Sequence, residues 1–186
     1  MTNGFDPLVL VGLQIGRADR DAVRRAYAWA VAAHYGQVRK DGSRLIDHVV
    51  TVARNVQRFA AQGNDAELLI AALLHDIVEN TPVPLSEVEA RFGARAACLV
   101  DAVTNREGES AAESALRARD AGPDALLLRL CDRLDGIQRS PGRLPEKRRK
   151  FLSASRETHL PLAEEHFPAL AEAMGAALAK AEATLR

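Results

Sequence analysis

An apolar helical run that ends in a histidine–aspartate pair places the strongest constraint on this chain. Residues 71–74 are alanines and leucines, and His75 and Asp76 follow them directly. Glu79 comes four residues after His75 and three after Asp76, so the three side chains share one face of a continuous helix. An imidazole and two carboxylates beside a buried surface make a poor core, but they can hold a metal ion and activate a water.

The apolar content of the chain favours helices. Hydrophobic residues make up 47% of the sequence, yet aromatic residues make up only 4%, because alanine and leucine carry most of the apolar surface. Such a composition suits helices better than β-sandwiches. A chain of 186 residues is long enough for one domain with a substantial core. We therefore expect a single all-α domain over residues 1–186, a helical bundle around one metal site.

Apolar positions recur at three- and four-residue steps, and this periodicity predicts most of the helices. The predicted helices cover residues 19–35, 48–61, 65 to about 80, 86–92, 94–104, 111–119, 125–138, 146–159 and 168–185. Ser86 and Glu89 have the spacing of a capping box. Residues 38–46 are polar and predict a loop or a small β-turn. Residues 1–17 show little periodicity and predict a lead-in turn.

Charge and hydropathy exclude several classes of function. The chain has 25 basic and 25 acidic residues, so nothing indicates a nucleic-acid partner. No apolar run is long enough to span a membrane, and residues 7–13 are too short for a signal-peptide core. We expect a cytoplasmic protein that acts on a small molecule, as a monomer or a small homo-oligomer. Cys98 and Cys131 lie in separate apolar runs and are expected to be buried free thiols.

Two further polar residues complete a candidate ligand set. Asp132 lies within an apolar segment, where an acid is seldom buried unless it is paired or bound to a cation. It is therefore either a core ion pair, with Arg133 or another arginine, or a metal ligand. The candidate ligands are His48, His75, Asp76 and Asp132. Two imidazoles and two carboxylates suit Mn²⁺, Fe²⁺, Co²⁺ or Zn²⁺, and they leave positions for water and a phosphate oxygen.

Three residues near these ligands have candidate roles in the chemistry. Glu79, one helical turn past the His-Asp pair, can accept the proton of an activated water. Arg39 and Lys40 are adjacent cations in a loop that leads to His48, so they can reach a phosphorylated substrate. In isolation such a loop would be an ordinary surface turn.

The remaining histidines and a basic run are expected to be structural. His34 should lie in the core or behind the ligands, whereas His159 and His166 should be partly exposed. Residues 147–150, which read Lys-Arg-Arg-Lys, predict a solvated helix face, with a nucleotide or partner contact as the alternative.

Several segments, taken in order, resemble the RelA/SpoT-type alarmone hydrolase domain of the HD phosphohydrolase superfamily. They are residues 33–43 with Ile46 and His48, residues 72–79, Phe92-Gly93 with residues 99–100 and 103–104, residues 130–135, and Glu157-Thr158 with residues 160–163. The resemblance covers about residues 20–165. It implies an all-helical fold that holds one Mn²⁺. Because no synthetase or regulatory segment follows, we expect a stand-alone small alarmone hydrolase.

The resemblance also implies an activity. The family removes the 3′-pyrophosphate from (p)ppGpp and releases GDP or GTP, so the expected substrate is a nucleotide. Glu79 matches the catalytic glutamate of the family, and Arg39 and Lys40 match residues that line the nucleotide site. The implied metal ligands are His48, His75, Asp76 and Asp132. Asn80 is at a catalytic position where the family usually has aspartate; an amide cannot accept a proton but can orient water.

Other positions around the ligands also depart from the family pattern. Gly136 replaces an asparagine, Asn105 replaces a lysine, and Arg44, Leu45 and Val49 replace Pro, Tyr and Pro. Three interpretations therefore stay open. The chain is a (p)ppGpp hydrolase, or it performs the same chemistry on another phosphorylated nucleotide such as (p)ppApp or NADPH, or it is a weakened hydrolase that serves as a nucleotide-binding module.

Overall fold

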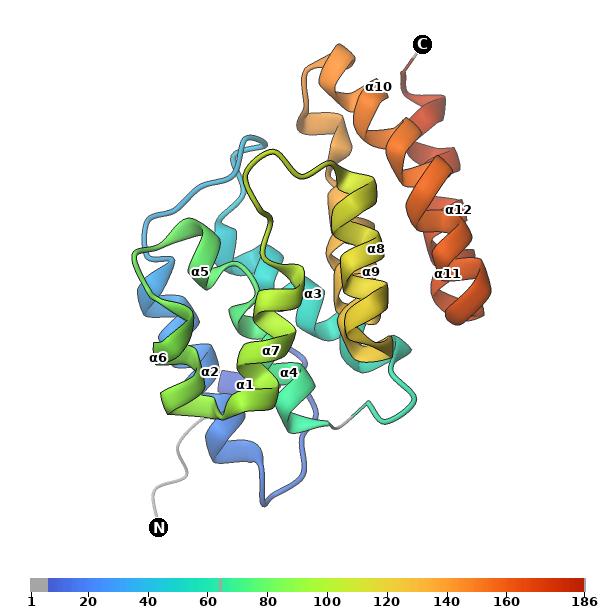
Figure 1. Cartoon of the computed structure of the whole chain (residues 1–186). Helices are drawn as coiled ribbons and strands as arrows, with labels where there is room; N and C mark the ends of the chain where they lie inside the picture. The colour runs from blue at the N-terminus through green and yellow to red at the C-terminus, as the bar shows by residue number, and fades with distance from the viewer. Residues whose placement is uncertain (1–6, 64, 186) are drawn as a thin grey trace.

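The computed structural model describes residues 7–63 and 65–185, which confirm the expected all-α fold (Figure 1). The elements are α1 (Pro7–Leu10), α2 (Arg20–Ala33), α3 (Leu45–Phe59), α4 (Ala66–Leu74), α5 (Ile77–Asn80), α6 (Leu85–Phe92), α7 (Ala94–Val103), α8 (Ala111–Ala121), α9 (Pro123–Gln138), η1 (Ser140–Gly142), α10 (Pro145–Ala154), η2 (Ser155–His159), α11 (Leu160–His166) and α12 (Pro168–Ala183). Of these, η1 is a 3₁₀ turn and η2 is a π-helical turn.

Helices α4 and α9 form the centre of the fold, because each buries a long stretch on every side. All residues from Leu68 to Leu74 of α4 are buried, as are all residues from Ala125 to Cys131 of α9. A helix buried all round needs packing partners in all directions. Accordingly, α4 packs against α2, α3 and α7, and α9 packs against α3, α7, α8 and α12. In Figure 1, α8 and α9 lie between the N-terminal helices and α10–α12.

The polar segment before α3 forms the predicted β-turn. Val38 and Arg44 make an antiparallel bridge, and the backbone N–H of Leu45 donates to the Gln37 carbonyl at 3.0 Å. This bridge closes the loop early, so α3 begins at Leu45 rather than three residues later. At the N-terminus, α1 replaces part of the predicted lead-in turn, of which residues 1–6 lie outside the described residues.

The capping box predicted at Ser86 and Glu89 is wrong. Pro84 takes the N-cap position of α6, and no side chain caps this helix. A capping box forms instead at the start of α8. There, the Glu113 backbone N–H donates to Ser110 Oγ at 3.2 Å, and the Ser110 backbone N–H donates to Glu113 Oε2 at 2.8 Å.

The two cysteines differ in burial. Cys131 is a buried free thiol, as expected, but Cys98 is exposed. The inward positions Ala97 and Val100 turn Cys98 to the outer face of α7. The expectation of two buried thiols is therefore wrong for Cys98.

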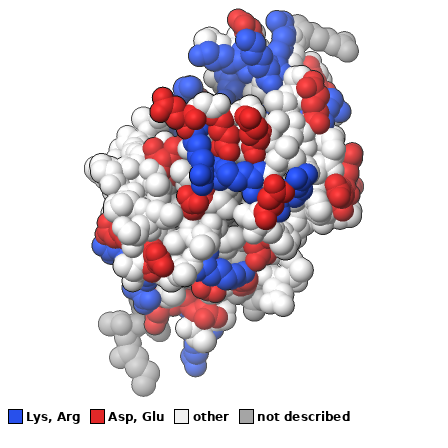
Figure 2. All heavy atoms as spheres, viewed as in Figure 1, with Lys and Arg blue, Asp and Glu red and all other residues white. Residues whose placement is uncertain are grey.

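The basic run at residues 147–150 is not uniformly solvated. Lys147, Arg149 and Lys150 are exposed, and Figure 2 shows basic side chains gathered at the end of the molecule where α10 lies. Arg148 is buried, however, and donates to the carbonyls of Thr184, at 3.3 Å, and Ala181. Arg148 therefore donates to carbonyl groups at the C-terminal end of α12, where intrahelical donors run out.

The C-terminal helix α12 has the predicted amphipathic pattern. Leu170, Met174 and Leu178 are buried, and α12 packs against α9 and α11. No helix within the described ranges is long and apolar enough to cross a membrane.

Asp65 anchors the start of α4, the helix that leads to the His-Asp pair. Its carboxylate accepts from the Leu68 backbone N–H at 3.0 Å, as the predicted N-cap, and pairs with Arg95 of α7 at 2.8 Å. Arg95 also pairs with Asp124 of α9 at 2.7 Å. The hydrogen bonds from Arg95 are the main reason why the pKa of Asp65 lies below its ordinary value.

We expect Asp65→Ala to lower the free energy of unfolding at neutral pH by about 1–2 kcal/mol, since a helix cap contributes about 1 kcal/mol and a partly exposed ion pair less. The pKa of Asp65 is lower in the folded than in the unfolded state. Its stabilisation is therefore present above about pH 4 and is lost as the pH falls through the folded-state pKa. Urea unfolding at pH 7 and at about pH 3 measures both effects.

The control is Asp120→Ala at the exposed end of α8, which should change the free energy of unfolding by less than about 0.5 kcal/mol. A loss for Asp65→Ala that is as large at about pH 3 as at pH 7 would contradict the assignment.

Candidate metal and substrate site

Three polar side chains from three separate elements meet at one point. His48 comes from α3, His75 from the turn between α4 and α5, and Asp132 from α9. Each offers one ligand atom, and these atoms all lie within 4.8 Å of one another. The Nε2 atoms of His48 and His75 are 3.3 Å apart, and Asp132 Oδ1 lies 3.3 Å from His48 Nε2. The structure therefore confirms a candidate metal site of two imidazoles and one carboxylate.

Asp76, the fourth expected ligand, lies beside this group. Its carboxylate oxygens are 3.5 Å from His75 Nε2 and 3.6 Å from His48 Nε2. It does not belong to the set whose atoms are all within 4.8 Å of one another. The carboxylate faces both imidazoles, and its place in the ligand set stays a prediction.

The expectation that residues 65 to about 80 form one continuous helix is wrong. α4 ends at Leu74, a turn holds His75 and Asp76, and α5 begins at Ile77. The Ala72 carbonyl accepts a hydrogen bond from His75 Nδ1 at 2.8 Å, and such side-chain bonds compete with the helical backbone pattern. His75 and Asp76 therefore lie in a turn between two helices, whereas Glu79 lies on α5.

Both histidines direct Nε2 at the shared point because each Nδ1 has an acceptor. His48 Nδ1 donates to Asp135 Oδ2 at 2.7 Å, and His75 Nδ1 donates to the Ala72 carbonyl. A proton on Nδ1 leaves the lone pair of the neutral ring on Nε2, as in metal-binding histidines with a carboxylate or carbonyl behind them. Two such lone pairs 3.3 Å apart call for a cation between them, so the donor set fits a divalent ion.

The surrounding charges stabilise a positive charge at this point. Burial lowers the pKa of His48, but hydrogen bonds to Asp132 and Asp135 outweigh burial and raise the pKa to about 9. Burial raises the pKa of Asp132, whereas the hydrogen bond to His48 and the charges of His48 and Arg129 lower it well below its ordinary value. Asp132 is therefore a carboxylate at neutral pH, and the carboxylates around His48 favour a positive charge at this point.

The alternative interpretation of Asp132, a core ion pair, is met in part, because Asp132 pairs with the buried Arg129 but is not itself enclosed in the core. Arg129 Nη1 lies 3.5 Å from Asp132 Oδ2, but the Asp132 side chain is 30% exposed. Arg133 donates instead to Ser155 Oγ at 2.7 Å and to the Phe151 carbonyl at 2.8 Å. Asp132 is thus accessible from the space next to the histidines.

That space is a pocket of about 700 Å³, large enough for a nucleotide. The basic side chains that line it are Arg39, Lys40, Arg129, Arg133, Arg139 and Arg143. The two expected substrate contacts, Arg39 and Lys40, are therefore both at the pocket. Arg39 also donates to Asp135 at 3.0 Å, which links the loop to the carboxylate behind His48. Guanidinium groups in this number suit a ligand with several phosphates.

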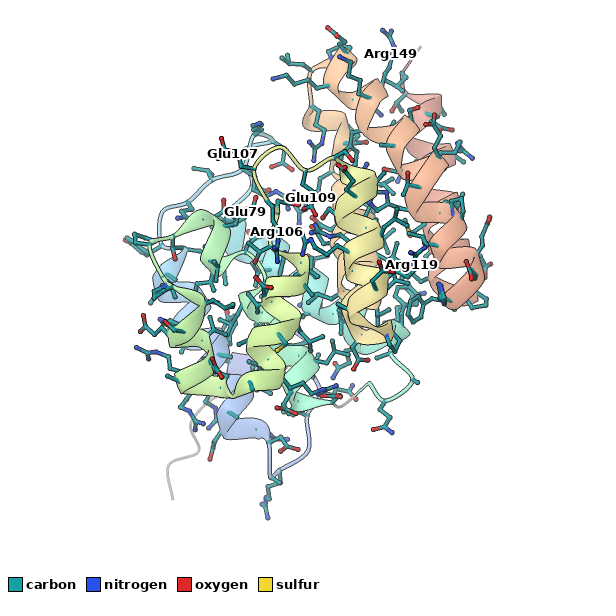
Figure 3. The ribbon with its side chains drawn as sticks, in the orientation of Figure 1. Glu79, Arg106, Glu107, Glu109, Arg119 and Arg149 are labelled. Atoms are coloured by element: carbon teal, nitrogen blue, oxygen red, sulfur yellow. The ribbon has the colours of Figure 1, made fainter. Side chains whose placement is uncertain are left out.

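Glu79 and Asn80 also line the pocket, from α5. Figure 3 shows Glu79 beside the loop between α7 and α8. Glu79 Oε2 accepts hydrogen bonds from Asn105, at 3.2 Å from the backbone nitrogen and 2.9 Å from Nδ2. Asn105, one of the departures from the family pattern, thus positions Glu79 with neutral donors. The Asn80 carbonyl accepts from Gln37 Nε2 at 2.9 Å, and Gln37 Oε1 accepts from the buried His34 at 3.0 Å.

Sequence reasoning missed Asp135, which is the buried carboxylate behind the ligands. Its side chain is only 2% exposed, and it accepts from His48, from Arg39 and, at 2.8 Å, from Arg139. The sequence signal was available, because Asp135 comes three residues after Asp132 and so lies near the same face of α9.

The expectation that His159 is partly exposed is wrong. His159 is buried, lies on the π-helical turn η2 and lines the pocket. Its Nδ1 donates to the Ala154 carbonyl at 3.1 Å, and burial together with the nearby Arg133 charge lowers its pKa to about 4. His159 is therefore a neutral ring at the pocket wall. His166, by contrast, is 36% exposed, as expected.

Known proteins resemble most of this chain. The HD domain family profile matches residues 26–166. A guanosine-3′,5′-bis(diphosphate) 3′-pyrophosphohydrolase from Aquifex aeolicus is 36% identical over 150 residues, which cover 77% of this chain and 21% of the relative. The bifunctional (p)ppGpp synthase/hydrolase SpoT of Escherichia coli is 34% identical over 151 residues, with 76% and 21% covered. The chain thus spans about a fifth of the length of the curated relatives it matches.

A solved structure has the same fold. The report of that structure states that a metazoan orthologue of SpoT hydrolyses ppGpp and plays a role in starvation responses. The two structures superpose with a TM-score of 0.75 at 24% sequence identity, over 86% of this chain and 94% of the other. At that identity the likeness establishes the fold alone.

Proposed function

Because this chain belongs to the HD domain family, we propose that it is a metal-dependent hydrolase that removes the 3′-pyrophosphate from (p)ppGpp and releases GDP or GTP. The observation that carries the proposal is that the group of His48, His75 and Asp132 opens into an arginine-rich pocket of nucleotide size. The relative from Aquifex aeolicus that is named for this activity aligns with 77% of the chain, which supports the same substrate class.

The proposed ion is Mn²⁺, held by His48, His75, Asp76 and Asp132. Imidazole and carboxylate donors suit Mn²⁺ and related divalent transition ions. When bound, such an ion polarises a phosphoryl group and lowers the pKa of water. Asp135 supports this ligand set by accepting the Nδ1–H of His48, which fixes the ring with Nε2 toward the centre.

Glu79 is the proposed general base. Asn105 holds one oxygen of its carboxylate, Oε2, so the other oxygen can accept the proton of the attacking water. The water oxygen attacks the phosphorus, the bond from that phosphorus to the ribose 3′-oxygen breaks, and the 3′-oxygen leaves as a hydroxyl with the proton that Glu79 took from the water. Asn80 would orient the water, because its amide cannot accept a proton.

Arg39 and Lys40 are the proposed contacts to the substrate phosphates. Asp135 anchors one nitrogen of Arg39, which leaves the other guanidinium N–H groups for the ligand. Lys40 is exposed and adds a mobile point charge at the rim.

A second candidate function keeps this chemistry and changes the substrate to another phosphorylated nucleotide, such as (p)ppApp or NADPH. The departures at Asn80, Asn105 and Gly136 favour it, because all three line the same pocket. A third candidate, a nucleotide-binding module with weak turnover, rests on Asn80 alone.

The test that separates these candidates is kcat/KM for ppGpp, ppApp and NADPH with added Mn²⁺. A higher value for ppApp or NADPH than for ppGpp would replace the leading proposal.

We expect Asn80→Asp to raise the kcat for ppGpp about tenfold or more, because it places a second proton acceptor beside Glu79. Steady-state kinetics with Mn²⁺ measures the change. The control Gln62→Glu adds the same charge at an exposed position near the end of α3 and should leave kcat unchanged. No change, or a fall, would instead favour an enzyme tuned to another substrate.

A further inference from the structure

One wall of the pocket consists of an aromatic ring between two arginines. Phe151 of α10 lines the pocket, and the guanidinium carbons of Arg133 and Arg143 lie 3.8 Å and 4.1 Å from its ring centroid. Guanidinium groups at such distances are attracted to the ring face. The ring therefore restrains two cationic side chains next to the candidate metal site.

Gly136 makes room for this ring. A Cβ atom at Gly136 would lie 2.8 Å from Phe151 Cζ, which is closer than side chains tolerate. Gly136 comes one helical turn after Asp132 on α9, about 6 Å along the helix axis. The family pattern has asparagine at this position. In this chain the Phe151 ring lies against Gly136, where an asparagine side chain would begin.

The two arginines on the ring differ in their partners. Arg133 donates to Ser155 Oγ and to the Phe151 carbonyl, so it fastens α10 to α9. The Arg143 side chain has no hydrogen bond or ion pair to any described residue, although it is only partly exposed. Its N–H groups at the pocket are thus available to a ligand.

The loop that carries Arg39 meets the segment that carries Arg143. A Cβ atom at Gly142 would lie 2.5 Å from Asp41 Cβ, so the two segments touch at backbone level. Burial and the Arg39 charge lower the pKa of Arg143 more than the carboxylates of Asp132 and Asp41 raise it. Burial removes water from the Arg143 guanidinium, and a bound anion would compensate for that loss.

We propose that Gly136, Phe151 and Arg143 form a specificity element, in which the ring holds the Arg143 guanidinium in place to bind a phosphate group of the substrate other than the one that is attacked. This inference rests on the proposed function. The phosphate belongs either to the 5′-polyphosphate or to the distal end of the 3′-pyrophosphate. Arg143 is the specificity-determining residue, and Phe151 and Gly136 act through it.

The first test compares Arg143→Ala with wild type on pppGpp, ppGpp and pGpp. A charge-assisted hydrogen bond to phosphate predicts a KM about 10- to 100-fold higher with kcat within about threefold. Arg143→Lys should lie in between, because it keeps the charge and loses the planar fork. Arg149→Ala, at an exposed position in the middle of α10 (Figure 3), should leave KM unchanged.

The substrate series identifies the phosphate. If Arg143 binds the 5′-polyphosphate, the effect of Arg143→Ala shrinks from pppGpp to pGpp. If it binds the distal 3′-phosphate, the effect is equal on all three substrates, and inhibition by inorganic pyrophosphate weakens by a similar factor. An unchanged KM on every substrate, together with unchanged pyrophosphate inhibition, would overturn the proposal.

Two ring variants test whether Phe151 acts through Arg143. Phe151→Leu keeps apolar bulk, and it should raise KM severalfold in wild type but not in the Arg143→Ala background. Gly136→Ala should show the same dependence, because its methyl group displaces the ring. Additive effects in both double variants would contradict a shared mechanism.

A binding measurement separates this inference from the proposed function. If wild type hydrolyses none of these substrates, calorimetric titration with GTP and with pyrophosphate replaces the kinetics. Binding to wild type that weakens about tenfold or more in Arg143→Ala would support the phosphate site even though the proposed reaction had failed. Equal binding by the two proteins, or no binding to wild type, would overturn it.

Discussion

Asp132→Ala is expected to remove the bound metal and to lower the turnover of ppGpp by more than about a thousandfold. Asp132 belongs to the group of three candidate ligands, and its oxygen is 3.3 Å from His48 Nε2. Loss of the metal removes several kcal/mol of transition-state stabilisation, and each 1.4 kcal/mol is a factor of ten in rate. Elemental analysis of the purified variant and steady-state kinetics measure the two effects.

The matched control for this experiment is Asp120→Ala, an aspartate at the exposed end of α8, which should keep both metal and activity. Circular dichroism establishes that Asp132→Ala is folded. Full metal occupancy in Asp132→Ala would contradict the proposed ligand set, and retained turnover would contradict the mechanism as well.

Glu79→Gln is expected to lower kcat by about 10²- to 10⁴-fold while the protein keeps its metal. Glu79 is at the pocket but outside the group of candidate ligands, and Asn105 holds one of its oxygens. An amide keeps the size of the side chain and cannot accept a proton. Because the variant changes a proton acceptor rather than a phosphate contact, KM should change little.

Glu107→Gln is the control for the base assignment. Glu107 is an exposed glutamate on the loop beside Glu79 in Figure 3, and its loss should leave kcat within about twofold. If Glu79→Gln loses its metal, Glu79 is a ligand rather than a base. A kcat within tenfold of wild type would remove Glu79 from the proton transfer.

The parts of the site that the sequence predicted are those with a strong local contrast. Asp132 is an acid within an apolar helix, and the His75-Asp76 pair interrupts another apolar run. In both places the contrast with the apolar neighbours indicated an unusual environment. The structure brings His75 and Asp132 together with His48 because α4 and α9 both pack against α3. Periodicity likewise predicted most of the helices, since each has an apolar face that packs against others.

The parts that the sequence did not predict depend on contacts between distant segments. The spacing from Asp132 places Asp135 near the same face of α9, but its role depends on His48, 87 residues earlier, which donates to it. The helix break at His75 coincides with a side-chain hydrogen bond to the Ala72 carbonyl, which periodicity cannot show. His159 is a polar residue in an amphipathic stretch, so the sequence indicated partial exposure. In the structure it lies on a π-helical turn and is buried.

The departures at Gly136 and Asn105 illustrate how a family pattern can mislead when residues are considered singly. In the sequence, Gly136 looks like a simple loss of the asparagine side chain. In the structure, the Phe151 ring packs against Gly136. Asn105 replaces a lysine, yet it donates two hydrogen bonds to Glu79. Each substitution has a partner elsewhere in the chain, so its meaning depends on the folded pocket.

The most direct test of the central claim is the turnover of ppGpp by the purified protein with added Mn²⁺, with the products separated by anion exchange. The proposed function predicts GDP and pyrophosphate in equal amounts, and no products when EDTA removes the metal. Intact ppGpp after incubation with folded, metal-loaded protein would contradict it.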